Sequence, residues 1–239
     1  MKKDDTGYFQ HLKILQEELI PAMGCTEPIA IAYGAAKAYA VLGELPQKVD
    51  LQVTANLIKN SKSVVVPNTG GLKGIGAAAA AGIVAGDADQ GLQVLSRVDP
   101  RRYGDIQDYL NSGKIDVKPL ESEHTFDMIV TAYGINSKAA VQISRYHTNI
   151  VLITKDDEVL LRQDVSDTSV GANYTDRGCL SIESILDFAQ SVEVTDIEGL
   201  LEQQITYNSQ IADEGLTMPP KSTYIQPKLR SGVTIYEFQ

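Results

Sequence analysis

Residues 20–28, Ile-Pro-Ala-Met-Gly-Cys-Thr-Glu-Pro, constrain the fold most, because they interrupt one helical pattern and open into another. Pro21 and Gly24 break the first pattern. Thr26 is a suitable N-cap, and Pro28 suits the first turn, where its missing N–H would have no intrahelical partner. The residues that follow are small and apolar on nearly all faces, which predicts a helix over 27–42 buried at the protein centre. The rest of the chain is expected to pack around this helix.

Cys25 is thereby predicted to lie at a helix N-terminus, next to the hydroxyl of Thr26 and the carboxylate of Glu27. Unpaired N–H groups and the positive end of the helix dipole favour a thiolate, so we expect a pKa below the free value of about 8.5. The alternative is that Cys25 packs as a small buried hydrophobe, as free cysteine usually does. The irregular turn favours a reactive site, since a core cysteine usually lies within a regular element.

A second candidate segment is the glycine-rich loop at 68–76, which leads into a predicted helix over 75–85. A strand, a glycine turn and then a helix can present backbone N–H groups to an anion such as a carboxylate or a phosphate. The loop has neither the Walker ending nor the dinucleotide fingerprint. A purely structural turn, which lets the alanine-rich helix approach a sheet closely, is the alternative.

The remaining pattern predicts an α+β fold: a helical core around the buried N-terminal helix, plus an inserted antiparallel-sheet subdomain. An amphipathic helix is predicted over 8–19, a strand over 49–55, a second extended stretch over 63–66 and a polar turn over 59–62 between these two. Further strands are predicted over 115–120, 126–133, 138–146, 149–154 and 159–162, and further helices over 181–191 and 195–212. The domain boundaries predicted are a catalytic-type segment 1–88, the inserted subdomain 89–165, a returning helical segment 166–216 and an irregular tail 217–239.

Composition excludes several classes of function. The net charge of −10 disfavours nucleic acid and anionic membranes as partners and leaves small neutral or zwitterionic substrates. Two cysteines without a Cys-x-x-Cys spacing give neither a disulfide framework nor a zinc signature. With no apolar signal segment at the N-terminus and no apolar run long enough to cross a bilayer, we expect a cytoplasmic protein.

The Gly-Cys-Thr-Glu-Pro run at 24–28 and the alanine-rich helix after it resemble the L-cysteine desulfidase family (UPF0597-type), which is related to the alpha domain of the iron–sulfur L-serine dehydratases. Further motifs agree in order and spacing along most of 12–216. They lie at 57–60, 66–74, 85–87 and 147–149. Several motifs in order are a specific signal, whereas each alone is weak.

The resemblance implies β-elimination of L-cysteine to sulfide, ammonia and pyruvate, with an L-serine dehydratase as the alternative. It assigns catalytic roles to Cys25, as base or proton carrier, and to Glu27. The implied amino-acid pocket comprises Thr26, Lys59, Asn60, Asn68, Thr69, Gly70, Gly71, His147 and Asn149. On residues alone, Lys59 and Asn60 could equally be a solvated loop, and Arg145, His147 and Asn149 could be a solvated strand edge.

Beyond Gly215 the resemblance ends, and the relatives it points to are considerably longer. Their later half supplies three cysteines for a [4Fe–4S] cluster, and Cys25 and Cys179 are not placed like those ligands. We therefore expect no cluster and no metal in this chain alone, which would be either a piece of a longer protein or a shortened gene product. A catalytically inactive remnant that binds an amino acid or self-associates stays open, and an apolar surface left bare would favour homo-oligomers.

Overall fold

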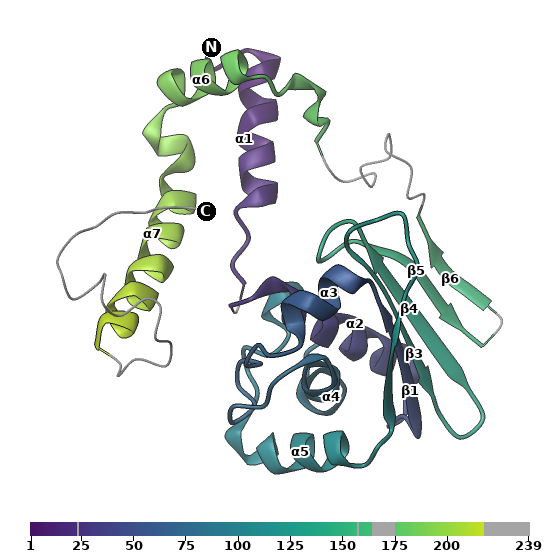
Figure 1. Cartoon of the computed structure of the whole chain (residues 1–239). Helices are drawn as coiled ribbons and strands as arrows, with labels where there is room; N and C mark the ends of the chain where they lie inside the picture. The colour runs from purple at the N-terminus through teal and green to yellow at the C-terminus, as the bar shows by residue number, and fades with distance from the viewer. Residues whose placement is uncertain (23, 157, 164–174, 218–239) are drawn as a thin grey trace. The chain divides into compact units, whose positions relative to one another are not determined.

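The computed structural model describes residues 1–22, 24–156, 158–163 and 175–217 (Figure 1). The chain forms two compact units, Pro21–Tyr174 and the pairing of Met1–Ile20 with Thr175–Gln239. Seven helices and one six-stranded sheet in the described residues confirm the predicted α+β class. The predicted tail lies outside the described residues beyond Thr217, as do residues 166–174 of the predicted helical segment.

The larger unit is built on one mixed sheet. Its strands are β1 (Lys48–Val53), β2 (Ile115–Pro119), β3 (Asp127–Tyr133), β4 (Lys138–Ser144), β5 (Ile150–Lys155) and β6 (Glu158–Arg162). Their order is β2-β1-β3-β4-β5-β6, with β1 and β2 parallel and every other pair antiparallel. In the register, Leu51 of β1 lies opposite Val117 on one side and Val130 on the other. Both Leu51 and Val130 are fully buried, so they mark the face that packs on the core.

Helix α2 (Thr26–Leu42) packs on β3 and β4, and α4 (Ile75–Ala85) packs on α2 (Figure 1). Next to them lie α3 (Ala55–Ser61), which contacts α2, and α5 (Tyr103–Asn111), which contacts α4. Single 3-10 turns, η1 (Gly91–Gln93) and η2 (Pro100–Arg102), lie between α4 and α5 in sequence. Ten of the seventeen residues of α2 are buried, as the sequence predicted for its apolar faces. At Gly82 of α4, a Cβ would lie 2.1 Å from the carbonyl oxygen of Ala32, so the two helices are in backbone contact.

Two local predictions were wrong. The segment predicted as a polar turn at 59–62 is mostly the last part of α3, because Leu57 is fully buried and anchors a full helical turn against the core. The stretch 63–66 forms only an isolated bridge between Val65 and Lys73 instead of a strand. Lys59 and Asn60 are therefore presented by a helix.

The smaller unit packs three helices and one 3-10 turn: α1 (Thr6–Glu18), η3 (Arg177–Cys179), α6 (Ile182–Ser191) and α7 (Val194–Thr217). Tyr8 lies at its centre. Its hydroxyl donates to Asp196 Oδ2 at 2.7 Å and accepts from the backbone N–H of Glu193 at 3.0 Å. Its ring meets Phe188 edge-on, with centroids 5.4 Å apart. One buried aromatic side chain thus ties α1 to both α6 and α7.

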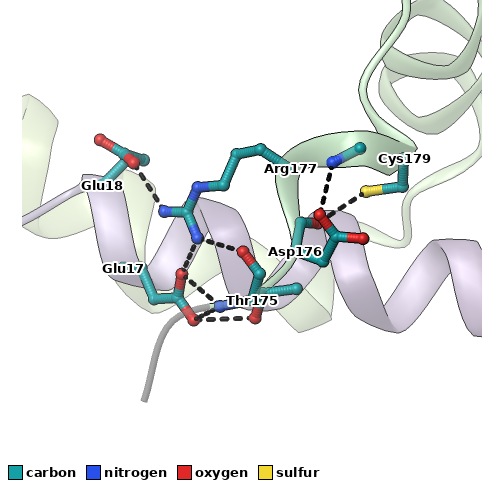
Figure 2. A network of polar contacts seen from close by, with 7 residues as sticks. Glu17, Glu18, Thr175, Asp176, Arg177 and Cys179 are labelled. Carbon is teal, nitrogen blue, oxygen red and sulfur yellow. Dashed lines mark hydrogen bonds and ion pairs between the residues drawn. The ribbon is translucent and has the colours of Figure 1, made fainter. Parts of the chain in front are cut away.

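A polar network holds η3 on the last turn of α1 (Figure 2). Arg177 forms ion pairs with Glu17 and Glu18, and Glu17 also accepts hydrogen bonds from the backbone N–H and the hydroxyl of Thr175. Because the Glu17 side chain is only 14% exposed, these partners replace the water that burial removes.

Helices α6 and α7 lie where the sequence predicted helices over 181–191 and 195–212. Ser181 and Ser184 form a reciprocal capping box at the start of α6. Helix α7 begins at Val194, one residue before the predicted start at 195, and it extends to Thr217, beyond the predicted end at 212. Among the described residues, no helix combines the length and the apolarity needed to cross a membrane.

Candidate functional site

The candidate site lies at the start of α2. Cys25 is the N-cap, with an extended backbone (φ −61°, ψ 121°), and Thr26 is the first helical residue, one position earlier than the sequence predicted. Glu27 is in the first turn. The Cys25 side chain is exposed, whereas Pro28 and Ile29 are already buried. The helix therefore presents a thiol at the surface while its body lies in the core.

The thiol is paired with a carboxylate. Cys25 Sγ donates to Glu27 Oε2 at 3.1 Å, and Asn60 Nδ2 of α3 donates to Glu27 Oε1 at 3.1 Å. The Thr26 hydroxyl lies 3.5 Å from the same Oε2 atom as Cys25. Each carboxylate oxygen of Glu27 thus has a donor, and a group from a separate helix fixes its orientation. A nucleophile, a base and a third group that orients the base is the arrangement that proton-transfer sites use.

The prediction of a lowered pKa for Cys25 was wrong. Partial burial, together with the hydrogen bond to Glu27 and the negative charge of Glu27, raises the pKa of the Cys25 thiol above its ordinary value. The backbone N–H of Glu27 acts in the opposite direction, as a helix N-terminus should, but more weakly. Burial and a carboxylate in direct contact together therefore outweigh the helix N-terminus and favour the protonated thiol.

Glu27 is the ionised partner. Burial alone would raise its pKa, but the hydrogen bonds from Cys25 and Asn60 and the electrostatic attraction of His147 outweigh this and lower the pKa below its ordinary value. The pair at neutral pH is therefore a neutral thiol hydrogen-bonded to a carboxylate.

His147 lies within electrostatic range of Glu27 from the turn between β4 and β5. Burial lowers its pKa, and the charge of Glu27 partly offsets this. Its ring packs against Phe126, with centroids 4.5 Å apart, and its Nε2 atom is buried without a hydrogen-bond partner among the described residues. Unpartnered buried polar atoms are rare in proteins, and a missing water or ligand is a common reason.

The turn that carries His147 differs from the predicted extension. Arg145 has a φ of +69°, which ends β4 and prevents residues 145, 147 and 149 from alternating along a strand. The Asn149 side chain donates to the carbonyl of Ser144 at 3.0 Å and closes the turn. His147 and Asn149 are therefore brought close by a turn, where the side chain of Asn149 serves the backbone.

The glycine-rich loop folds back on itself. The Thr69 hydroxyl donates to the carbonyl of Val66 at 2.7 Å and accepts from the N–H of Leu72, while Asn68 donates to the carbonyl of Leu95. Gly70 and Gly71 have positive φ values of 72° and 96°, which this tight return requires.

The loop nevertheless adjoins the thiol-bearing turn. A Cβ at Gly24 would lie 3.8 Å from Cγ of Pro67, so the residue before Cys25 contacts the residue before the loop. Among the residues predicted for the site, hydrogen bonds link Cys25, Thr26 and Asn60 to Glu27, and His147 interacts with Glu27 only electrostatically. Lys59 is exposed and forms no ion pair with a described residue. The substrate-binding roles of Lys59, Asn68, Thr69, Gly70, Gly71 and Asn149 stay predictions.

Sequence reasoning did not include Phe126, the aromatic wall behind His147. It lies just before β3, far from His147 in sequence, and its pattern is that of an ordinary core residue. A separate surface hollow of about 450 Å³ lies at the β3–β4 turn, lined by residues 133–138 and Asp156. It contains none of the predicted site residues.

Comparison with known proteins finds relatives that share one name. A UPF0597 protein of Desulfitobacterium hafniense is 49% identical over 216 residues, which is 90% of this chain and 50% of the relative. A UPF0597 protein of Treponema denticola is 38% identical over the same lengths, and one of Lachnoclostridium phytofermentans is 41% identical over 209 residues. No family model and no solved structure matches the chain.

The chain spans about half the length of these relatives. The matched stretch of 216 residues starts no later than residue 24 and ends no earlier than residue 216 of the 239-residue chain, so it always contains residues 24–216. The match to the Desulfitobacterium protein therefore includes the whole candidate site, as well as α6 and nearly all of α7.

Proposed function

The chain belongs to the UPF0597 family over about nine-tenths of its length, and we propose that it contains a site for β-elimination from a small amino acid. In this site, the cluster of Cys25, Glu27 and Asn60 would carry out the acid–base steps. The observation that carries the proposal is the hydrogen bond from the Cys25 thiol to the Glu27 carboxylate, which Asn60 orients, at an exposed helix start. The preferred substrate is L-cysteine, by the resemblance of the motif at 24–28.

In this proposal the thiol of Cys25 carries the proton. As Sγ takes the α-proton of L-cysteine, its own proton passes to Glu27, and the electron pair of the Cα–H bond forms the Cα–Cβ double bond. The Cβ–S bond breaks, and the Cys25–Glu27 pair returns a proton to the departing sulfide, which leaves as hydrogen sulfide. The 2-aminoacrylate that remains takes up one water and yields pyruvate and ammonia. Asn60 keeps Glu27 in place throughout, which is a positioning role.

Charge placement supports an amino acid as the ligand. The exposed cation Lys59 lies one residue from Asn60 on α3, and Glu27 is an anion. A zwitterion needs one cationic and one anionic contact at short range. The buried Nε2 atom of His147 offers a further polar contact close to Glu27.

An iron–sulfur cluster does not fit the residues present. A [4Fe–4S] cluster is held by several thiolates, and the sequence has only Cys25 and Cys179, one in each compact unit. Within the described ranges, no group of three or more His, Cys, Asp or Glu side chains could hold a metal ion. In the proposed reaction, Cys25 and Glu27 therefore carry the proton transfers.

The test combines binding and turnover. The full chain is titrated calorimetrically with L-cysteine and with L-serine, and D-cysteine serves as a stereochemical control. Pyruvate and sulfide are assayed in the same samples under anaerobic conditions. We expect L-cysteine to bind, and we expect Cys25→Ala and Asn60→Ala to abolish sulfide release while Cys179→Ser leaves it unchanged.

The other possible results of this test distinguish a dehydratase, a protein that only binds an amino acid, and a protein without the proposed site. Pyruvate from L-serine but not from L-cysteine would identify a dehydratase. Binding without any product would identify an amino-acid-binding remnant. No heat and no product with either amino acid would overturn the proposed site.

A further inference from the structure

The smaller unit exposes an apolar face on α6 and α7. Helix α7 has 24 residues, and none of them is buried. Val194, Ile205 and Leu216 recur every eleven residues, which is about three helical turns, so they lie along one side of α7. They are 68%, 63% and 60% exposed. On α6, Ile182 is 76% and Leu186 55% exposed. A helix in a protein derives most of its stability from packing its apolar face against other elements. The exposure of these apolar side chains therefore indicates that another polypeptide segment packs against them.

These helices belong to the family fold. The match to the Desulfitobacterium protein includes residues 24–216 and therefore α6 and nearly all of α7. About half of the length of that relative, and of the Treponema protein, is not matched by this chain. The segment that forms α6 and α7 is shared with a relative about twice as long as the matched stretch. The unmatched half of that relative is therefore the first candidate to pack against these helices.

The charge around the face argues against a second copy as the cover. Residues 182–217 contain eight acidic residues and no Lys or Arg. Lys3 pairs with Glu193 and Asp196, and the N-terminal ammonium pairs with Asp187. The other five carboxylates of the segment form no ion pair with a described residue. They are Glu183, Glu198, Glu202, Asp213 and Glu214. Two copies meeting through this face would bring like charges together, whereas a partner with an apolar centre and a basic rim would complement it.

We propose that the apolar face of α6 and α7 is the docking surface for the half of the UPF0597 fold that this chain does not contain. The occupant is a polypeptide corresponding to the unmatched half of the relatives, joined to it or separate from it. This inference concerns the smaller unit alone and does not depend on the chemistry proposed for Cys25.

The test co-expresses the full chain with the unmatched half of the Desulfitobacterium hafniense protein. Size-exclusion chromatography with light scattering measures the stoichiometry, and hydrogen exchange measures the protection of the α7 amides. We expect a one-to-one complex that weakens with added salt, and α7 amides that exchange rapidly in the chain alone and slowly in the complex.

A matched pair of variants locates the surface. Ile205→Asp places a charge within the apolar face and should weaken the complex by about tenfold or more. Gln210→Asp adds the same charge five residues further along α7, where the side chain points about 140° away around the helix, and should change the affinity less than about twofold. Since both positions are exposed, neither variant should lose its fold, and circular dichroism checks this.

Several results would overturn the inference. A dimer of the chain alone that Ile205→Asp abolishes would make a second copy the occupant. Slow exchange of α7 in a monomer would show that the chain covers its own face. No association of the two polypeptides, or an association equally strong in Ile205→Asp, would remove this face as the docking surface.

Discussion

Cys25 Sγ lies 3.1 Å from Glu27 Oε2 and donates a hydrogen bond to it across the first turn of α2. The thiol and the carboxylate are two residues apart in sequence, yet the carboxylate is held from the other side by Asn60 of α3. This pairing decides which group at the site carries the proton and which carries the charge.

Glu27→Gln should make Cys25 more reactive. The substitution removes the negative charge that raises the pKa of the thiol, so the thiolate forms at lower pH. In a Cys179→Ser background, the rate of alkylation by iodoacetamide is followed against pH. We expect the rate profile to move to lower pH and the rate at neutral pH to rise several-fold. An unchanged profile would show that Glu27 does not control the thiol.

His147→Gln should flatten the dependence of stability on pH. Burial lowers the pKa of His147 below its ordinary value of 6.5, so between these two values the unfolded chain binds more protons than the folded chain. The contribution of His147 to stability is therefore full above pH 6.5 and declines as the pH falls towards the folded pKa.

Urea unfolding of the larger unit between pH 7.5 and pH 5 would measure this difference between wild type and His147→Gln, with the pH values chosen around the ordinary histidine pKa. The expected result is a smaller loss of stability at acidic pH in the variant. Glu27→Gln should have the reverse effect, because it removes the charge that raises the pKa of His147. Equal pH dependence in all three proteins would contradict the prediction.

Gly82→Ala should destabilise the larger unit by about 3 kcal/mol. The new Cβ would lie 2.1 Å from the carbonyl oxygen of Ala32, and a backbone atom within a helix cannot move aside as a flexible side chain can. Gly104→Ala in α5 is the control, since its Cβ meets nothing within 4 Å. Thermal unfolding should show a large loss for the first variant and no loss for the second, and equal effects would mean that α2 and α4 do not touch as described.

Arg177→Ala should loosen η3 from α1. It leaves the largely buried carboxylate of Glu17 without its cation, which we expect to cost about 1–2 kcal/mol of the stability of this contact. Hydrogen exchange at the Thr175 amide, which donates to Glu17, reports the loss directly. Glu18→Gln is the control, because Glu18 is 61% exposed and its ion pair with Arg177 should contribute little. Equal protection of Thr175 in Arg177→Ala and wild type would show that Arg177 does not hold the contact.

Elements with a strong periodic or compositional signal were predicted well. The buried helix, the alanine-rich helix and the strands of β3 and β4 follow from apolar patterns that leave few other ways to bury their side chains. The last part of α3 was missed because 59–62 is polar, and only the burial of Leu57 against the core favours a helix there. The local sequence does not reveal which distant part of the chain a single side chain packs against.

The sequence alone determined that a thiol, a hydroxyl and a carboxylate occupy consecutive positions at the start of a buried helix. The reason is that the apolar residues after them are buried on nearly all faces only if they form a helix in the core. The tertiary structure decided their protonation. Asn60 of a separate helix and His147 of a distant turn both favour the charged form of Glu27, the first by a hydrogen bond and the second electrostatically. Burial and the charge of Glu27 then favour the protonated form of Cys25. These effects outweigh the helix N-terminus, and they depend on residues far apart in sequence, which no local pattern reveals.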